Sequence, residues 1–169
     1  MNYHNITKED MLNGDGLRAV LWVAGCTHHC LDCQNPETWD LAGGIEFDKA
    51  AHDELFEALK PEYITGITFS GGDPMHPFNR EEVLALAKEI KETLPNKTTW
   101  LYTGFLWEDL KDKIDLSNID VLVDGEFKID LKDTNLKWVG SSNQRVIDVQ
   151  KSLKEGRVVL HCDINPKAN

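Results

Sequence analysis

The chain has 169 residues, of which 41% are hydrophobic, and its 29 acidic and 18 basic residues give a formal net charge of −11. This length and apolar content predict a single domain over residues 1–169 that can bury a sizeable core. No apolar run approaches the ~20 residues that a membrane-spanning helix needs. The negative charge gives no general attraction to phosphate backbones, so we expect neither a membrane nor a nucleic acid as a partner.

Short apolar or β-branched runs alternate with helical patterns along most of the chain. Strands are predicted at residues 17–24, 64–70, 98–102 and 119–123. Helices are predicted at residues 48–59, from Asn79 to a stop at Pro95, and at residues 108–113. The alternation then weakens: residues 126–131 and 158–162 are weaker strand candidates, and residues 142–153 between them are of undetermined type.

This alternation predicts an α/β fold with a mainly parallel sheet. A full eight-unit β/α barrel takes ~250 residues, so we expect a partial, open β/α barrel instead. Functional sites in such sheets gather at the carboxyl ends of the strands. The loops there are residues 26–35, 70–74, 103–105 and 124–127.

The first of these loops holds three cysteines, Cys26, Cys30 and Cys33, in a C-x3-C-x2-C spacing. Three thiolates are one short of the four that usually close an iron–sulfur site. A 4Fe-4S cluster held by three thiolates keeps one iron open to a small molecule. The spacing therefore favours a cluster at which chemistry can take place.

Two other interpretations of the cysteines were weighed. A zinc site with His28, His29 or Cys162 as its fourth ligand is less favoured, because no second pair of ligands with zinc-finger spacing is present. A disulfide framework is also disfavoured, because 4 cysteines in 169 residues without a signal peptide indicate a reducing, cytoplasmic environment.

A second loop, Ser70-Gly71-Gly72-Asp73-Pro74, has two glycines directly after a predicted strand. Glycine permits backbone angles and a close approach that a side chain forbids, so the backbone here can face a ligand. Alone, the segment would read as a plain turn. Together with the cysteine loop it favours a ligand site.

The two loops resemble the cofactor site of the radical S-adenosylmethionine (SAM) superfamily. Further segments narrow the resemblance to one family, the activating proteins of anaerobic (class III) ribonucleoside-triphosphate reductases. They run nearly end to end and include residues 13–18 (NGDGLR), 35–39 (NPETW), 69–77 (FSGGDPMHP), 102–105 (YTGF), 120–125 (DVLVDG) and 140–145 (GSSNQR).

This resemblance implies a set of cofactor contacts. Cys26, Cys30 and Cys33 would bind the 4Fe-4S cluster. The SAM-binding residues would be Asp32, Cys33, Gln34, Ser70, Gly71, Gly72 and Asp73, with Asp73 replacing the glutamate that is more usual in the superfamily and Asp32 replacing a frequent aromatic residue.

The resemblance also implies an activity and partners. A reduced cluster would cleave SAM to methionine and a 5′-deoxyadenosyl radical, which abstracts hydrogen from a glycine near the C-terminus of the reductase. A low-potential donor such as flavodoxin or ferredoxin would supply the electron. Two alternatives stay open: an activase of another glycyl-radical enzyme, of the pyruvate formate-lyase type, and a non-catalytic zinc-binding module.

For several other residues we favour a role outside the chemistry. Arg18 is expected at the surface, His28 and His29 in an exposed loop without function, and Cys162 in apolar surroundings. Asp124 and Glu126 are expected to stabilise the turn in which they lie. Residues 151–169 suggest no role.

Overall fold

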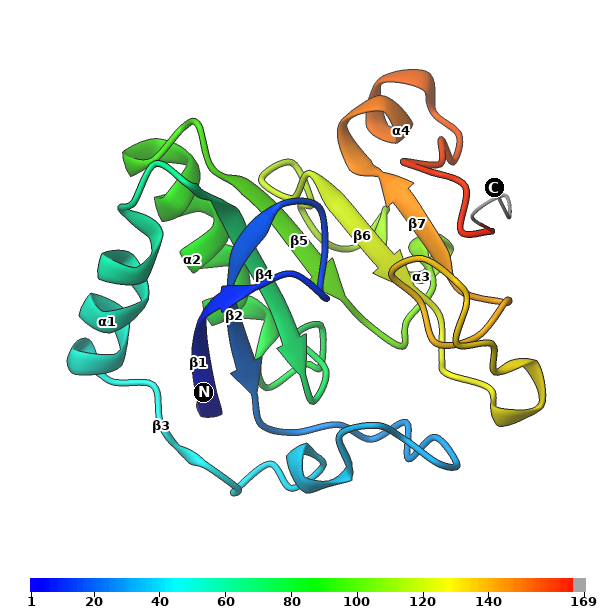
Figure 1. Ribbon diagram of the computed structural model, residues 1–169, viewed down its shortest axis with the longest axis horizontal. Coiled ribbons are helices and arrows are strands. Elements are labelled where there is room, and N and C mark those ends of the chain that lie inside the picture. The colour runs from blue at the N-terminus through cyan, green and yellow to red at the C-terminus, as the bar shows by residue number, and fades with distance from the viewer. Residues whose placement is uncertain (166–169) are drawn as a thin grey trace.

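A seven-stranded sheet in the order β3-β1-β2-β4-β5-β6-β7 forms the centre of the computed structural model, which describes residues 1–165 (Figure 1). The strands are β1 (Asn2–Asp10), β2 (Leu17–Val23), β3 (Ile45–Glu46), β4 (Ile64–Gly71), β5 (Thr98–Tyr102), β6 (Val121–Asp124) and β7 (Arg145–Asp148). Strands β2, β4, β5 and β6 are parallel. Antiparallel β1 and β3 flank them on one side and antiparallel β7 on the other, so the fold is mixed α/β with an open sheet.

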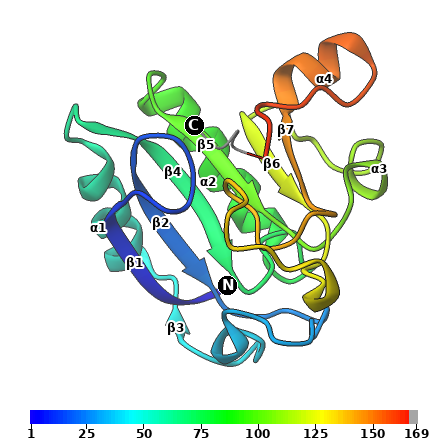
Figure 2. The same ribbon diagram turned by 45° about the vertical axis from the view of Figure 1, so that its right-hand side comes forward.

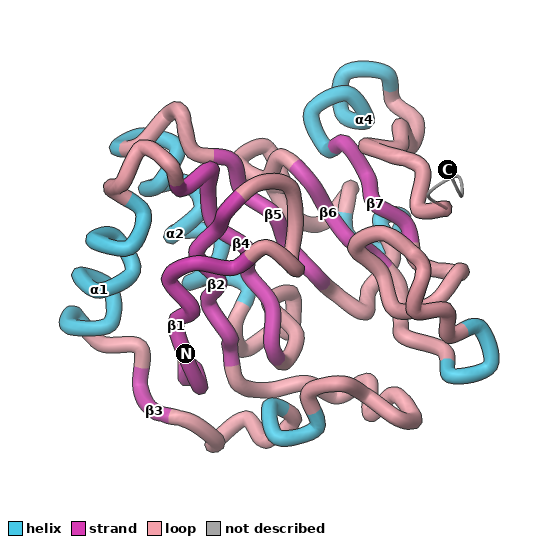
Figure 3. Tube along the Cα trace, viewed as in Figure 1, coloured by secondary structure: helices cyan, strands magenta, loops and turns pink. Residues whose placement is uncertain are grey.

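Three helices pack on one face of this sheet, and short helical turns interrupt the long loops (Figure 3). The helical segments are α1 (Lys49–Leu59), α2 (Arg80–Thr93), α3 (Trp107–Leu110), α4 (Val149–Glu155) and the 3-10 turns η1 (Pro36–Thr38) and η2 (Ile129–Leu131). Asp48 caps α1 by accepting a hydrogen bond from the Ala51 amide. No helix among the described residues combines the length and apolarity needed to cross a membrane.

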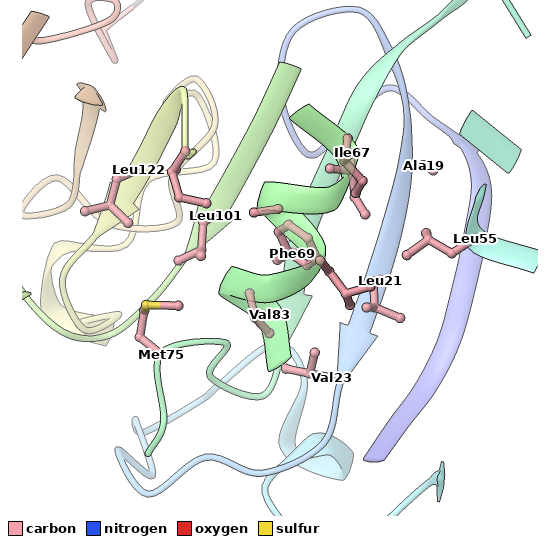
Figure 4. Close-up of a cluster of buried hydrophobic side chains, with 14 of the residues drawn as sticks. Ala19, Leu21, Val23, Leu55, Ile67, Phe69, Met75, Val83, Leu101 and Leu122 are labelled. Carbon is pink, nitrogen blue, oxygen red and sulfur yellow. The ribbon is translucent and has the colours of Figure 1, made fainter. Parts of the chain in front are cut away.

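The main core lies between the sheet and α1 to α3. Side chains alternate along β4, so that Ile67 and Phe69 face the helices while Thr68 faces the other way. In Figure 4 these two side chains lie around Val83 of α2, together with Leu21 of β2 and core residues of β5 and β6. Full burial of each large apolar side chain contributes about 1.5–3 kcal/mol, which fixes the register of the parallel strands.

The opposite face of the sheet carries a smaller cluster. It consists of Trp100, Val121, Val123 and Val146, covered by partly buried Trp138, Val139, Cys162 and Ile164 and by Tyr102. The segment after α4 returns across this face through backbone hydrogen bonds from His161 to Val146 and from Lys137 to Ile164. Cys162 thus lies in the expected apolar surroundings, but it is only partly buried.

Arg18 is buried on this face, so its expected surface position was wrong. Its guanidinium donates to the Thr68 hydroxyl at 2.8 Å and to the carbonyls of Ile67 at 2.6 Å and Thr98 at 2.9 Å, and it lies 5.5 Å from the Trp100 ring centroid. Burial lowers the pKa of Arg18 to about 10. The Asp15 carbonyl and the Thr98 hydroxyl accept the remaining N–H groups of Arg18, so all five donors are satisfied. These bonds offset the cost of removing the charge from water.

The four predicted parallel strands and three predicted helices are confirmed, with α3 shorter than expected. Strand β1 was not predicted because its sequence is largely polar, with only Tyr3 and Ile6 buried. Residues 126–131 are not a strand but a loop that ends in η2, and residues 158–162 form only an isolated bridge between Leu160 and Ile147. The undetermined segment 142–153 contains β7 and most of α4.

Candidate cofactor site at the carboxyl ends of the parallel strands

A cavity of about 480 Å³ lies where the parallel strands β2, β4, β5 and β6 end. Figure 2 shows the segment after β2 passing below the strand arrowheads toward the loop that follows β6. The lining residues from these loops include Cys26, His28, Cys30, Cys33, Gln34, Ser70, Gly71, Gly72, Asp73, Thr103, Gly104, Gly125 and Glu126. The structure therefore brings together the loops that the sequence placed at one edge of the sheet.

Asp32 is the predicted cofactor residue that does not line this cavity. Its side chain is more than half exposed and lies 3.0 Å from the ammonium of Lys132. Its backbone has a positive φ of 60°, which aspartate tolerates better than most residues. In this structure Asp32 is thus an exposed loop residue paired with Lys132.

The cysteine loop is fixed at both ends by backbone hydrogen bonds. The Gly25 amide donates to the Thr38 carbonyl at 2.7 Å, and the Cys26 amide donates to the Trp39 carbonyl at 3.0 Å. Inside the loop, the Cys33 amide donates to the Cys30 carbonyl at 3.1 Å. The loop therefore folds back on itself and turns all three thiols toward one cavity.

The donor set fits a 4Fe-4S cluster. All four cysteines are free thiols, and three of them line one cavity. Each thiolate of such a cluster binds a different iron. Burial raises the pKa of Cys26 to about 11, so cluster binding at this cysteine must release a proton.

The glycine loop after β4 packs directly on the start of the cysteine loop. The Gly72 amide donates to the Val23 carbonyl at 2.8 Å, and the Asp73 amide donates to the Gly25 carbonyl at 2.7 Å. A Cβ atom on Gly72 would lie 2.5 Å from the Gly25 oxygen. We expected this glycine to admit a ligand, but the structure gives it a further reason, which is close contact between two backbones.

The Asp73 carboxylate is buried and fully engaged. Its Oδ1 accepts hydrogen bonds from the Met75 amide and the Thr103 hydroxyl, both at 2.8 Å. Its Oδ2 accepts from the Gly104 amide at 3.1 Å and lies 2.7 Å from His28 Nε2. Asp73 thereby ties the end of β4 to the loop after β5.

His28 was expected in an exposed loop, and this expectation was wrong. Its ring lies between two carboxylates, with Nε2 2.7 Å from Asp73 and Nδ1 2.7 Å from Glu126, and its side chain is only 13% exposed. The bond to Asp73, with a smaller contribution from Glu126, raises the pKa of His28 to about 9 against the opposing effect of burial. His29 is exposed as expected, and its ring packs against Trp39 in a T-shaped arrangement with 4.8 Å between the ring centroids.

Asp124 and Glu126 serve different partners rather than each other. Glu126 bonds to His28, whereas fully buried Asp124 pairs with Arg145 and accepts a hydrogen bond from the Trp107 amide at 2.8 Å. Both side chains bond to residues outside their own turn, so the expected turn role was wrong for both, and Asp124 instead holds the start of α3.

Asn79 is a site-supporting residue that the sequence indicated only as a helix cap. It precedes α2, but its side chain makes no capping bond. Instead its Nδ2 donates to the carbonyls of Ala24 at 2.9 Å and Asp73 at 3.1 Å. Asn79 therefore joins the residues that precede the cysteine loop to the glycine loop.

Residues 12–147, which include the three cysteines of the first loop, match the family model described as a 4Fe-4S single cluster domain, so the chain belongs to this class of iron–sulfur proteins. The chain is also similar to anaerobic ribonucleoside-triphosphate reductase-activating proteins. It is 43% identical over 152 residues to that of Escherichia coli (strain K12), which covers 86% of this chain and 97% of the relative. It is 42% identical over 146 residues to that of Enterobacteria phage T4, with 86% and 93% covered. The chain belongs to the family of anaerobic ribonucleoside-triphosphate reductase-activating proteins.

Proposed function

We propose that this protein is a radical SAM enzyme that installs a glycyl radical near the C-terminus of an anaerobic ribonucleoside-triphosphate reductase. The observation that carries the proposal is the meeting of three free thiols and a glycine loop in one cavity, in a chain of the activating-protein family. The open sheet would correspond to the partial β/α barrel expected from the sequence. The free thiols support a reducing compartment, the cytoplasm.

The cluster ligands in this proposal are Cys26, Cys30 and Cys33. When bound, the 4Fe-4S cluster would supply one electron to the sulfonium of SAM, whose C5′–S bond breaks to give methionine and a 5′-deoxyadenosyl radical. The protein's own task is to place the ligands, exclude water and admit the glycine.

The SAM-binding surface in this proposal is the glycine loop and the end of the cysteine loop. Ser70, Gly71 and Gly72 line the cavity after β4, and Gln34 lines it from the cysteine loop. A SAM contact by Asp32 stays a prediction, because its side chain lies outside the cavity lining.

Three aromatic side chains of the cavity lining would shield a radical. They are Trp22, Tyr102 and Trp138, and the Tyr102 hydroxyl donates to the Trp138 carbonyl at 2.9 Å. Burial raises the pKa of Tyr102, so this hydroxyl stays protonated and bonded. Large, fixed aromatic side chains keep water away from the reacting atoms.

The substrate would be a peptide segment of the reductase that delivers a glycine Cα–H to the cavity. The cavity lining includes Leu12 and Asn13 of the β1–β2 loop and residues 138–140. A low-potential donor, flavodoxin or ferredoxin, would provide the electron.

The test is anaerobic incubation of the reconstituted protein with the reductase, SAM and a low-potential reductant. We expect a glycyl radical in the electron paramagnetic resonance (EPR) spectrum, split by the remaining α-hydrogen, and one 5′-deoxyadenosine for each radical. A reductase with that glycine replaced by alanine, and the Cys30→Ala form of this protein, are the matched controls. Activation of a pyruvate formate-lyase type enzyme in place of the reductase would favour the alternative partner, and a loaded cluster that never cleaves SAM would refute the proposal.

A further inference from the structure

We propose that His28 is a positioning residue of the cofactor site, and that Asp73 acts on bound SAM through His28 rather than by direct contact. This inference rests on the proposed function for the identity of the ligand. It concerns two residues whose contacts the structure defines fully.

The first observation is that Asp73 has no acceptor site left for a ligand. A carboxylate offers about four lone-pair positions, and in Asp73 the donors of Met75, Thr103, Gly104 and His28 take them all. The side chain is 2% exposed. A ligand amino group could reach this carboxylate only by displacing one of these donors.

The second observation is that the His28 ring fits a socket made by three neighbouring strand ends. Asp73 follows β4, Gly104 follows β5 and Glu126 follows β6. A Cβ atom on Gly104 would lie 2.5 Å from the His28 ring. The Phe105 ring packs against His28 in a T-shaped arrangement, with 4.8 Å between the ring centroids. The glycine at position 104 therefore leaves room for the ring itself.

The socket matters for the cofactor site because of where His28 lies in the chain. His28 lies between Cys26 and Cys30, so the socket fixes the middle of the cysteine loop relative to the glycine loop. SAM bound as proposed would contact both loops. Loss of the ring would let them shift apart, and a misplacement of ~1 Å can cost on the order of 100-fold where groups must be aligned.

The experiment compares His28→Ala, His28→Gln, Gly104→Ala and the control His29→Ala after anaerobic reconstitution. The readouts are iron and sulfide content, SAM affinity by equilibrium dialysis, and the change that SAM causes in the EPR spectrum of the reduced cluster. For His28→Ala we expect wild-type iron content, SAM affinity lower by about tenfold or more, and a loss of the SAM-induced spectral change. Gly104→Ala should share this phenotype, because its methyl group displaces the ring.

The two remaining variants separate positioning from general damage. A glutamine amide can still donate to Asp73, so His28→Gln should recover much of the affinity, and His29→Ala should behave as wild type. Wild-type SAM binding and spectra in His28→Ala would overturn the inference, and so would loss of iron from that variant, which would make His28 a support of the thiols alone.

A double-mutant cycle tests the statement about Asp73. If Asp73 acts through His28, Asp73→Asn should weaken SAM binding in the wild-type background but add little in the His28→Ala background. Equal losses in both backgrounds would show that Asp73 acts independently of His28 and would overturn the proposal. Failure of the wild-type protein to bind SAM would instead refute the proposed function, so the two failures are distinguishable.

Discussion

Asp124, fully buried at the end of β6, pairs with Arg145 at the start of β7. Arg145 Nε donates to Asp124 Oδ1 at 3.0 Å, and its Nη2 donates to Oδ2. The two residues are direct partners in the antiparallel β6–β7 register. Because Gly125 and Glu126 follow immediately, this ion pair anchors the loop that carries one wall of the cofactor cavity.

The first prediction is that Arg145→Met lowers the free energy of unfolding by about 3–5 kcal/mol, since it leaves a buried carboxylate without its counter-charge. Urea denaturation near pH 7 measures this value. Arg157→Met is the matched control, because Arg157 pairs with Glu155 in an exposed position and should contribute only about 0–1 kcal/mol. Similar losses in both variants would contradict the assignment. The Asp124→Asn/Arg145→Met double variant should be more stable than Arg145→Met alone.

The second prediction concerns pH. Arg145 also bonds to Glu108 and lowers the pKa of that carboxyl. A pKa lowered by folding contributes stability above its unfolded value, near 4.5, that is lost as the pH falls through the folded value. The wild-type protein should therefore lose this contribution in acid. Arg145→Met lacks it, so the difference in unfolding free energy should stay constant from pH 7 to about 5 and shrink as the pH falls below about 4.5. A difference that stays constant below pH ~4.5 would contradict the prediction.

The third prediction concerns the cluster ligands. Replacing Cys26, Cys30 or Cys33 by alanine should abolish cluster assembly and SAM cleavage, because two thiolates leave two irons open to solvent and exchange. Cys162→Ala should retain the cluster, because Cys162 packs on the opposite face near Trp100 and Trp138 and does not line the cavity. Iron and sulfide analysis after anaerobic reconstitution provides the measurement. A Cys162→Ala protein without iron would reopen a four-ligand site.

The sequence predicted the parallel core of this fold because the pattern of each core strand is local. Residues 64–70 combine β-branched and apolar residues with small ones and lie beside turn residues, so they identify a strand by themselves. Strand β1 gives no such signal, because it is an outer, polar strand stabilised by pairing with β2. Residues 126–131 have strand-like composition, yet they follow a loop that Asn143 and Gln144 hold from a distant part of the chain.

The site residues also divide into those that a local sequence pattern reveals and those that depend on long-range contacts. The cysteine spacing and the glycine pair are local and were located from the sequence. The contacts of His28, Arg18 and Asn79 join residues 45, 50 and 55 positions apart. Such pairings depend on which strand ends become neighbours in the sheet, and a single sequence does not encode that in a local pattern.

The fourth prediction gives a role to the C-terminal segment. His161 Nε2 lies 2.6 Å from Asp15, and Ile164 packs on the small cluster around Trp100. We expect the His161→Ala/Ile164→Ala variant to lose about 1–2 kcal/mol of unfolding free energy, measured by urea denaturation, while its iron content stays at the wild-type level. Loss of iron would show that this segment supports the cluster site as well.

The last prediction concerns Gly72. A Cβ atom there would lie 2.5 Å from the Gly25 oxygen, and this neighbour is backbone, so Gly72→Ala must push the glycine loop away from the residue that precedes Cys26. We expect iron content and SAM affinity to fall together. Gly156→Asn is the matched control: Gly156 has a φ of 67° with nothing near its Cβ position, and asparagine tolerates that conformation. Its iron content and SAM binding should equal those of the wild type. Retention of full iron by Gly72→Ala with loss of SAM binding alone would show that the glycine serves the ligand and not the contact between the two loops.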